Sequence, residues 1–132
     1  MDKAKTIALN IAVAAVIAII FLWANTLYRQ HVQFDKGNQA FKAEDFTGAV
    51  AGYEAAIHMY TPGSSVVERS AERLWQLGTL MEQQRDTARA LVAYRALRSS
   101  FYGVRWFAQP GKDWIAKCDA RIAALVKLQG GR

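Results

Sequence analysis

The chain has 132 residues, a single cysteine and a formal net charge of +6 at pH 7. A chain of this length holds one small domain at most, and a single cysteine excludes a disulfide framework within it. The apolar fraction of 52% is raised by one N-terminal segment, which sets that part of the chain apart from the rest.

A basic N-terminal tail, residues 1–5, precedes an apolar run that we predict to be a transmembrane helix over residues 6–25. Between its two polar ends the run has no charge and one polar side chain, that of Asn10. As a helix it is about 27 Å long, close to the ~30 Å hydrocarbon core of a bilayer. Trp23 and Tyr28 would lie at the membrane–water interface. A cleaved signal peptide is the alternative, but the run is longer than the usual ~7–15 residues and no small-residue cleavage site follows it.

The predicted span carries small side chains along one ridge, a pattern typical of helices that pack closely within membranes. Ala8, Ala12 and Ala15 lie on this ridge. Asn10 is placed either to bond across helices or to reach the lipid headgroups. These four residues are the candidates for helix–helix contact in the membrane.

The charges that flank the span set its orientation only weakly. Lys3 and Lys5 precede it, and Arg29, Lys36 and Lys42 follow it. The count of Lys and Arg does not decide the orientation, but the short basic start favours a cytoplasmic N-terminus. We therefore predict that the soluble domain lies outside the cytoplasm, with a bacterial inner membrane as the expected location.

Two stretches beyond the span share one internal spacing. Each starts at a glycine, Gly37 or Gly78, and has an aspartate at +8, an alanine at +12 and a tyrosine at +16. Two copies of one spacing indicate two copies of one supersecondary unit. We predict two helical hairpins, over residues 26–60 and 64–101.

The start of the first hairpin leaves two alternatives open. There is no proline or glycine between Asn25 and Gly37, so the membrane helix either runs on to Ala43 as one rod of about 57 Å or breaks near Asn25. Asp45 is the expected cap of the next helix. In the second hairpin, Ser65 and Glu68 have the spacing of a capping box.

The first hairpin resembles the tetratricopeptide repeat (TPR) family. The residues that carry the resemblance are Gly37, Phe46, Ala49, Tyr53, Ala56 and Pro62. The second copy departs from the family pattern, because Thr87 replaces the aromatic residue, and the two glycines are 41 residues apart. The resemblance implies that the first helix of each hairpin lines a concave surface that binds peptides or protein segments.

That implied surface supplies the candidate partner-binding residues. They are Phe34, Asn38, Phe41, Lys42, Trp75, Thr79 and Glu82. Phe34, Phe41 and Trp75 are equally compatible with core positions, and both interpretations remain open at this point.

The helical periodicity of apolar residues ends at residue 101. We predict that residues 102–110 form a loop rich in aromatic residues. Tyr102, Arg105 and Trp106 are residue types that dominate binding hot spots; the loop either presents them to a partner or tucks back over the repeats. A capping helix is predicted over residues 111–128. Its expected apolar face comprises Trp114, Ile115, Cys118, Ile122 and Leu125, as the end of a repeat array requires.

The charge is uneven along the soluble part. Residues 26–84 carry five Lys or Arg against seven Asp or Glu, whereas residues 85–132 carry ten against three. The basic half is compatible with a solvated face, with anionic lipid headgroups or with an acidic protein partner. We do not expect nucleic-acid binding, because no recognition motif accompanies the charge.

The sequence contains few residues in arrangements typical of catalysis or metal binding. His31 and His58 are 27 residues apart, with no HExxH motif and no cysteine near either. We expect no catalytic residue, no metal site and no cofactor.

Together these features predict an all-α protein: an N-terminal transmembrane helix followed by a TPR-like helical-hairpin array over residues 26–129 with a C-terminal capping helix. The expected function is that of a non-enzymatic membrane-anchored adaptor that binds a protein partner, itself part of a membrane complex. The alternative is a small accessory subunit of a larger membrane complex, held mainly through its transmembrane helix. The oligomeric state is left open.

Overall fold

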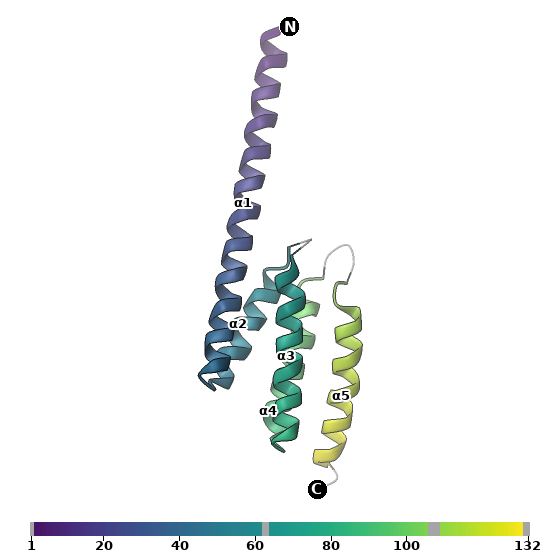
Figure 1. Ribbon diagram of the computed structural model, residues 1–132. Helices are drawn as coiled ribbons and strands as arrows, with labels where there is room; N and C mark the ends of the chain where they lie inside the picture. Colours follow the sequence, from purple (N-terminus) through teal and green to yellow (C-terminus); the bar gives the residue numbers. More distant parts are fainter. Residues whose placement is uncertain (1, 62–63, 106–108, 131–132) are drawn as a thin grey trace.

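The computed structural model describes residues 2–61, 64–105 and 109–130. Those residues form five α-helices and no strand (Figure 1), so the predicted all-α class is confirmed. The helices are α1 (Asp2–Lys42), α2 (Phe46–His58), α3 (Ser65–Gln83), α4 (Thr87–Gly103) and α5 (Lys112–Gly130).

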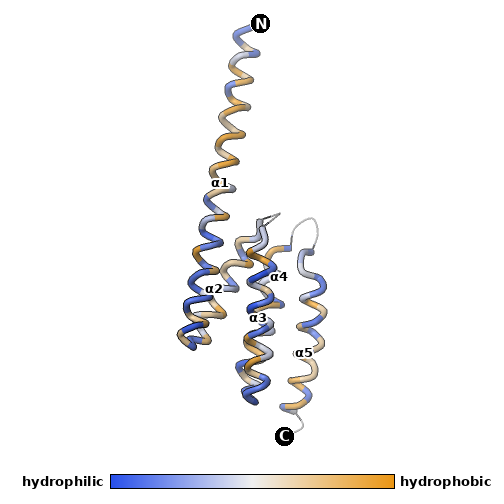
Figure 2. The backbone as a smooth tube through the Cα atoms, viewed as in Figure 1, coloured by the Kyte–Doolittle hydropathy of each residue, from blue (hydrophilic) through white to orange (hydrophobic). Residues whose placement is uncertain are grey.

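The N-terminal helix α1 is continuous over 41 residues, so of the two alternatives the unbroken rod is the one observed. Its first half projects beyond all other elements (Figure 1), and its second half packs against α2. Figure 2 shows that the projecting half is the apolar part of the helix. Within the described residues α1 is the one helix long and apolar enough to cross a membrane, and none of its most apolar window is buried.

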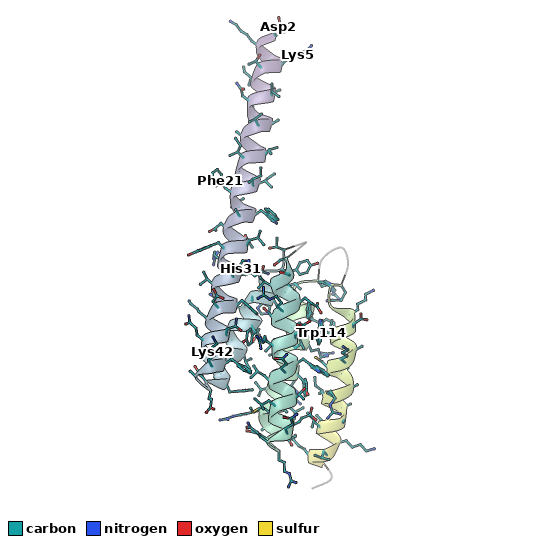
Figure 3. The ribbon with its side chains drawn as sticks, in the orientation of Figure 1. Asp2, Lys5, Phe21, His31, Lys42 and Trp114 are labelled. Atoms are coloured by element: carbon teal, nitrogen blue, oxygen red, sulfur yellow. The ribbon has the colours of Figure 1, made fainter. Side chains whose placement is uncertain are left out.

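Beside the second half of α1, each of the other helices runs antiparallel to the helix before it in the chain (Figure 1). The last turns of α2 and α4 and the first turns of α3 and α5 lie at the end from which α1 projects, which we call the proximal end (Figure 1). The α1–α2 and α3–α4 turns lie at the opposite end, called the distal end. Side chains labelled in Figure 3 mark the same axis, with Asp2 and Lys5 at the tip of the projecting half and Lys42 at the distal end.

The two distal turns have one geometry. Glu44 and Arg85, 41 residues apart, both have left-handed backbone, with φ of 59° and 60°. Asp45 then caps α2 by accepting from the amide of Gly48 at 3.0 Å, and Asp86 caps α4 by accepting from the amide of Arg89 at 3.1 Å. The predicted cap at Asp45 is confirmed, and the repeated spacing corresponds to a repeated turn.

The glycines that start each copy allow close helix packing. A Cβ on Gly37 would lie 2.9 Å from the ring of Tyr53, and a Cβ on Gly78 would lie 2.5 Å from the ring of Tyr94. The same tyrosines form tilted aromatic pairs with the preceding helices, at 5.7 Å between ring centroids for Phe34 and at 5.0 Å for Trp75. In both hairpins, therefore, a tyrosine ring packs directly against a glycine, because any other residue at that position would place a side chain where the ring lies.

The core lies between the two hairpins, with α2 in contact with α1, α3 and α4. Its largest fully buried aliphatic and aromatic side chains are Tyr53, Ile57, Leu74, Tyr94, Leu97 and Phe101. The predicted apolar face of the last helix packs against this core, with Ile115, Cys118 and Leu125 buried and Trp114 and Ile122 half-buried.

Helix ends differ from the expected ones at two places. The cap of α3 is Ser64, whose hydroxyl accepts from the amide of Val66 at 3.3 Å, so the predicted capping box at Ser65 is wrong. Glu68 instead accepts a hydrogen bond from the indole N–H of Trp114 at 3.0 Å. The helix α4 also runs two residues into the segment expected to be loop, because Tyr102 and Gly103 are still helical.

Candidate partner-binding groove

A groove of about 480 Å³ opens at the distal end, between the α1–α2 turn and the last turns of α3. We call it the distal groove. The left-handed residue Glu44 reverses the chain there, and so brings the end of α1 and the start of α2 to one side of the groove. Its lining residues are Phe41, Lys42, Glu44, Asp45, Phe46, Ala49, Leu77, Leu80, Met81, Gln84 and Arg89.

The distal groove has an apolar wall and a polar rim. Leu77 and Met81 are buried in the wall, and Phe41 and Phe46 are half-buried. Leu80 stands out from the rest because 37% of it is exposed to solvent. Among the large apolar lining residues Leu80 is therefore the most accessible to a group that enters the groove.

Cations flank the aromatic side chains of the distal groove. The guanidinium of Arg89 lies 5.7 Å from the centroid of the Phe46 ring and 3.6 Å from the carboxylate of Asp86. The guanidinium of Arg73 lies 5.9 Å from the ring of Phe41. These contacts cover the two rings from the solvent side.

The predicted concave surface is only partly accessible. Phe34 is 4% exposed and lies beneath Arg69, whose guanidinium is 4.9 Å from its ring. Of its two open interpretations, the core position is the one that the structure favours. Phe41 and Lys42 are the two of the seven predicted residues that line the distal groove.

The remaining four predicted residues are engaged in contacts within the domain. Asn38 accepts a hydrogen bond from the hydroxyl of Tyr53 at 2.6 Å, and the Thr79 hydroxyl donates to the Trp75 carbonyl at 2.9 Å. Glu82 accepts from the hydroxyl of Tyr94 and pairs with Arg121.

Trp75 is half-buried between Tyr94, at 5.0 Å between ring centroids, and Trp114, at 6.1 Å. In Figure 3 Trp114 lies on α5 beside α3. The contact between Trp75 and Trp114 and the hydrogen bond from Trp114 to Glu68 join α5 to α3. Trp114 therefore covers part of Trp75, one of the residues of the predicted concave surface.

The two tyrosines that support this surface remain protonated donors over a wide pH range. Burial raises the pKa of Tyr53. Burial also raises the pKa of Tyr94, and the hydrogen bond to Glu82 adds to the rise. Both hydroxyls therefore keep the hydrogen that they donate.

Other predicted site residues lie far from the distal groove. Tyr102 and Arg105 are exposed at the proximal end, and the guanidinium of Arg98 lies 4.7 Å from the Tyr102 ring. Trp106 lies outside the described residues. Two residues proposed for a membrane interface, Trp23 and Tyr28, are both exposed on α1.

The small residues predicted for contact within the membrane are exposed on the projecting half of α1. They are Ala8, Asn10, Ala12 and Ala15. This half of the helix presents its whole circumference to its surroundings, so these four side chains have no role inside the domain.

Residues that sequence reasoning missed include Gln30 and Leu80. Gln30 is fully buried and donates from its Nε2 to the carbonyls of Ala56 at 3.0 Å and Met59 at 3.1 Å. Its Oε1 accepts a hydrogen bond from the hydroxyl of Ser64. The periodicity of apolar residues does not indicate which polar residues are buried, so it could not identify Gln30. Leu80 lies outside the apolar face of α3, so the same periodicity could not identify it as a groove residue.

No group of three or more His, Cys, Asp or Glu side chains among the described residues is arranged to hold a metal ion. Comparison of the chain with models of protein families, with curated proteins and with solved structures gave no match.

Proposed function

We propose that this chain is a single-pass membrane protein whose helical domain acts, without catalysis, as an adaptor for a protein partner. The observation that carries the proposal is the division of α1, which is apolar and unburied over its first half and packed into a domain over its second. A helix that exposes a full apolar circumference in water would carry a large cost. A bilayer removes that cost, and the continuous helix then fixes the domain next to the membrane.

We infer further that the two hairpins form a short array of the TPR type. The support is the 41-residue offset, which relates the left-handed turns, the aspartate caps and the glycine–tyrosine contacts of the two hairpins. In this arrangement α5 occupies the position of the next first helix and caps the array. We propose a bacterial inner membrane as the location, with the N-terminus in the cytoplasm.

The distal groove is the proposed contact surface for the partner. Its apolar wall suits one or two apolar side chains of an extended or helical segment, and its rim of Lys42, Glu44, Gln84 and Arg89 offers both charge signs to the flanking residues. The groove faces away from the proposed membrane, so a water-soluble partner has free access to it.

A second function is favoured by the exposed ridge on the projecting half of α1. There Ala8, Ala12 and Ala15 would allow close approach of a neighbouring membrane helix, and the protein would be an accessory subunit of a membrane complex. The two functions differ in the part of the chain that touches the partner.

Photo-crosslinking in native membranes separates these functions. A photoreactive residue is placed in the full-length protein at Leu80 in the groove, at Ala12 in the span or at the exposed residue Ala123 on α5 as a control. Adducts at Leu80 above the level at Ala123 are expected for the adaptor. Adducts at Ala12 alone would support the accessory subunit, and equal yields at all three positions would contradict both.

A matched pair of substitutions tests the groove itself. Leu80→Asp and Val92→Asp each add a charge at an exposed aliphatic position of the same hairpin, but Val92 lies outside the distal groove. We expect Leu80→Asp to lower the amount of co-purified partner by at least about tenfold, as for a hot-spot residue. Val92→Asp should leave it unchanged.

A further inference from the structure

The proximal end of the domain carries an unusual set of exposed side chains. The chain has five tyrosines; Tyr53 and Tyr94 are buried in the core, and Tyr28, Tyr60 and Tyr102 are 69%, 41% and 42% exposed. Tyr60 follows α2, Tyr102 lies in the last turn of α4, and Tyr28 lies on α1 just beyond its apolar half. All three exposed tyrosines therefore lie at the proximal end, although they come from three different elements (Figure 1).

Contacts between helix ends fix the height of this end along α1. The amide of Gln30 binds the carbonyl of Met59 and the hydroxyl of Ser64, so the α2–α3 connection lies level with Gln30. A Cβ on Gly103 would lie 3.7 Å from the imidazole of His58, which brings the end of α4 to the same level as the end of α2.

That height lies just outside the headgroup layer of a bilayer. Gln30 is six residues beyond Ala24, the end of the apolar run, which corresponds to about 9 Å of helix rise. The headgroup layer on each side of the hydrocarbon core is roughly 5–8 Å thick. Because α1 has no break between the two residues, the ends of α2 and α4 lie next to the outer surface of this layer.

The charges at the proximal end suit an anionic surface. Arg29, Arg105 and Lys112 are exposed there, against two exposed acidic side chains, Asp113 and Glu68, the second in the first turn of α3. Tyrosine is enriched where its ring meets the acyl boundary and its hydroxyl meets water, and cations near an anionic leaflet are attracted to it.

We propose that the proximal end of the domain rests on anionic lipid headgroups, with Tyr28, Tyr60 and Tyr102 in the interface and Arg29, Arg105 and Lys112 next to lipid phosphates. The inference rests on the proposed membrane anchor and adds a second, surface contact to it. The domain is then held at two places, by the span and by its own end, and the distal groove lies at the end of the domain furthest from the membrane.

Spin labels on the full-length protein in lipid nanodiscs test this contact. Single cysteines are introduced at Tyr60, at Tyr102, at Ala123 as an exposed control on α5 and at Ile17 within the span. The native Cys118 is fully buried and does not compete for the label. Collision with a water-soluble nickel chelate is compared with collision with oxygen, which is enriched in lipid.

We expect the labels at positions 60 and 102 to be several-fold less accessible to the chelate than the label at position 123. Equal access at 60, 102 and 123, with position 17 shielded in lipid, would overturn the surface contact and leave the anchor intact. Chelate access at position 17 as well would overturn the anchor and the surface contact together.

A charge series tests the anionic specificity. In nanodiscs that contain anionic lipid, Arg105→Gln with Lys112→Gln should raise chelate access at position 102. Each charge removed should weaken the equilibrium constant for contact between the domain and the lipid surface about fivefold. The matched pair Arg85→Gln with Lys127→Gln, which lies away from the proximal end, should have no effect. An identical response of both pairs, or no difference between anionic and zwitterionic lipid, would overturn the assignment of anionic headgroups.

Discussion

A single buried amide determines how the long helix meets the domain. Gln30 satisfies two carbonyls at the end of α2, Ala56 and Met59, and accepts from the residue that caps α3. Helix ends leave their last carbonyls without intrahelical partners, so this one side chain completes the end of one helix and holds the start of the next.

Gln30→Met should therefore lower the free energy of unfolding by about 1–3 kcal/mol, because methionine keeps the volume but leaves buried carbonyls and a hydroxyl without their partner. Chemical denaturation of the full-length protein in detergent measures the change. Gln39→Met, at an exposed position of the same helix, should stay within about 0.5 kcal/mol of the unaltered protein. Equal effects of the two substitutions would show that the amide bonds contribute nothing.

The one thiol of the chain gives a pH-dependent prediction. Cys118 is 0% exposed, and burial raises its pKa to about 12 from the ordinary value of 9.0. Between these two pH values the unfolded chain releases the thiol proton and the folded chain keeps it. The contribution of Cys118 to stability is therefore complete below about pH 9 and is lost as the pH rises towards 12, by at most about 1.4 kcal/mol per pH unit.

Cys118→Ala removes this dependence. The difference in unfolding free energy between the two proteins should be constant below pH 9 and should shift in favour of the alanine variant as the pH rises through the window set by the raised pKa. Tyrosines and lysines titrate equally in both proteins and cancel in the difference. A difference that stays constant through the same window would contradict the burial of the thiol.

Residue-scale features also show where sequence reasoning succeeds. The cap at Asp45 followed from the sequence, because a cap is a local requirement of a helix start. The repeated spacing likewise indicated the repeated hairpin. The sequence predicted Ser65 and not Ser64 as the cap of α3. Serine is favoured as a cap at either position, and only the geometry of the hydroxyl distinguishes the two.

At the scale of elements, the continuity of α1 is the feature with the largest consequence. The first buried residue of α1 is Gln30, and in the preceding turn Thr26 and Leu27 are only half-buried, so few tertiary contacts hold that turn helical. The segment nonetheless stays helical because it contains no proline or glycine, and both of its flanks are helical.

Thr26→Pro should break this connection without unfolding the domain. Proline removes a backbone hydrogen bond and costs the helix about 3 kcal/mol locally, while the packed part of α1 begins four residues later. Spin-label distances between cysteines placed at Ile17 and Ala123 should form a narrow distribution in the otherwise unaltered protein and a broad one in the proline variant. Thr26→Ala is the control, and a narrow distribution in Thr26→Pro would mean that the membrane or another contact fixes the domain instead.

At the scale of the whole molecule, the domain is a short linear array in which each helix packs mainly on its neighbours. The inner helices have contacts on both sides, whereas α5 packs mainly on α4. Such arrays lose structure from their ends inward.

Hydrogen exchange should reproduce this order. We expect the slowest exchange in α2 and in the middle of α3 and α4, which hold the fully buried side chains Tyr53, Leu74 and Leu97. Residues 126–130 follow the last buried residue of α5, Leu125, and should exchange fastest within the domain. Protection of this last turn equal to that of α2 would indicate an additional contact on α5, such as a bound partner or a second copy.

The sequence by itself determined the helical class, the apolar half of the N-terminal helix, the repeated turn and the apolar face of the last helix. Each of these depends on residues close to one another along the chain, and a periodic pattern of side chains is enough to specify them. The tertiary structure alone decided that Phe34 is buried, that Gln30 joins three helices and that a groove opens at the distal end. These features depend on contacts between side chains far apart in the sequence, for which no local pattern exists until the helices have packed.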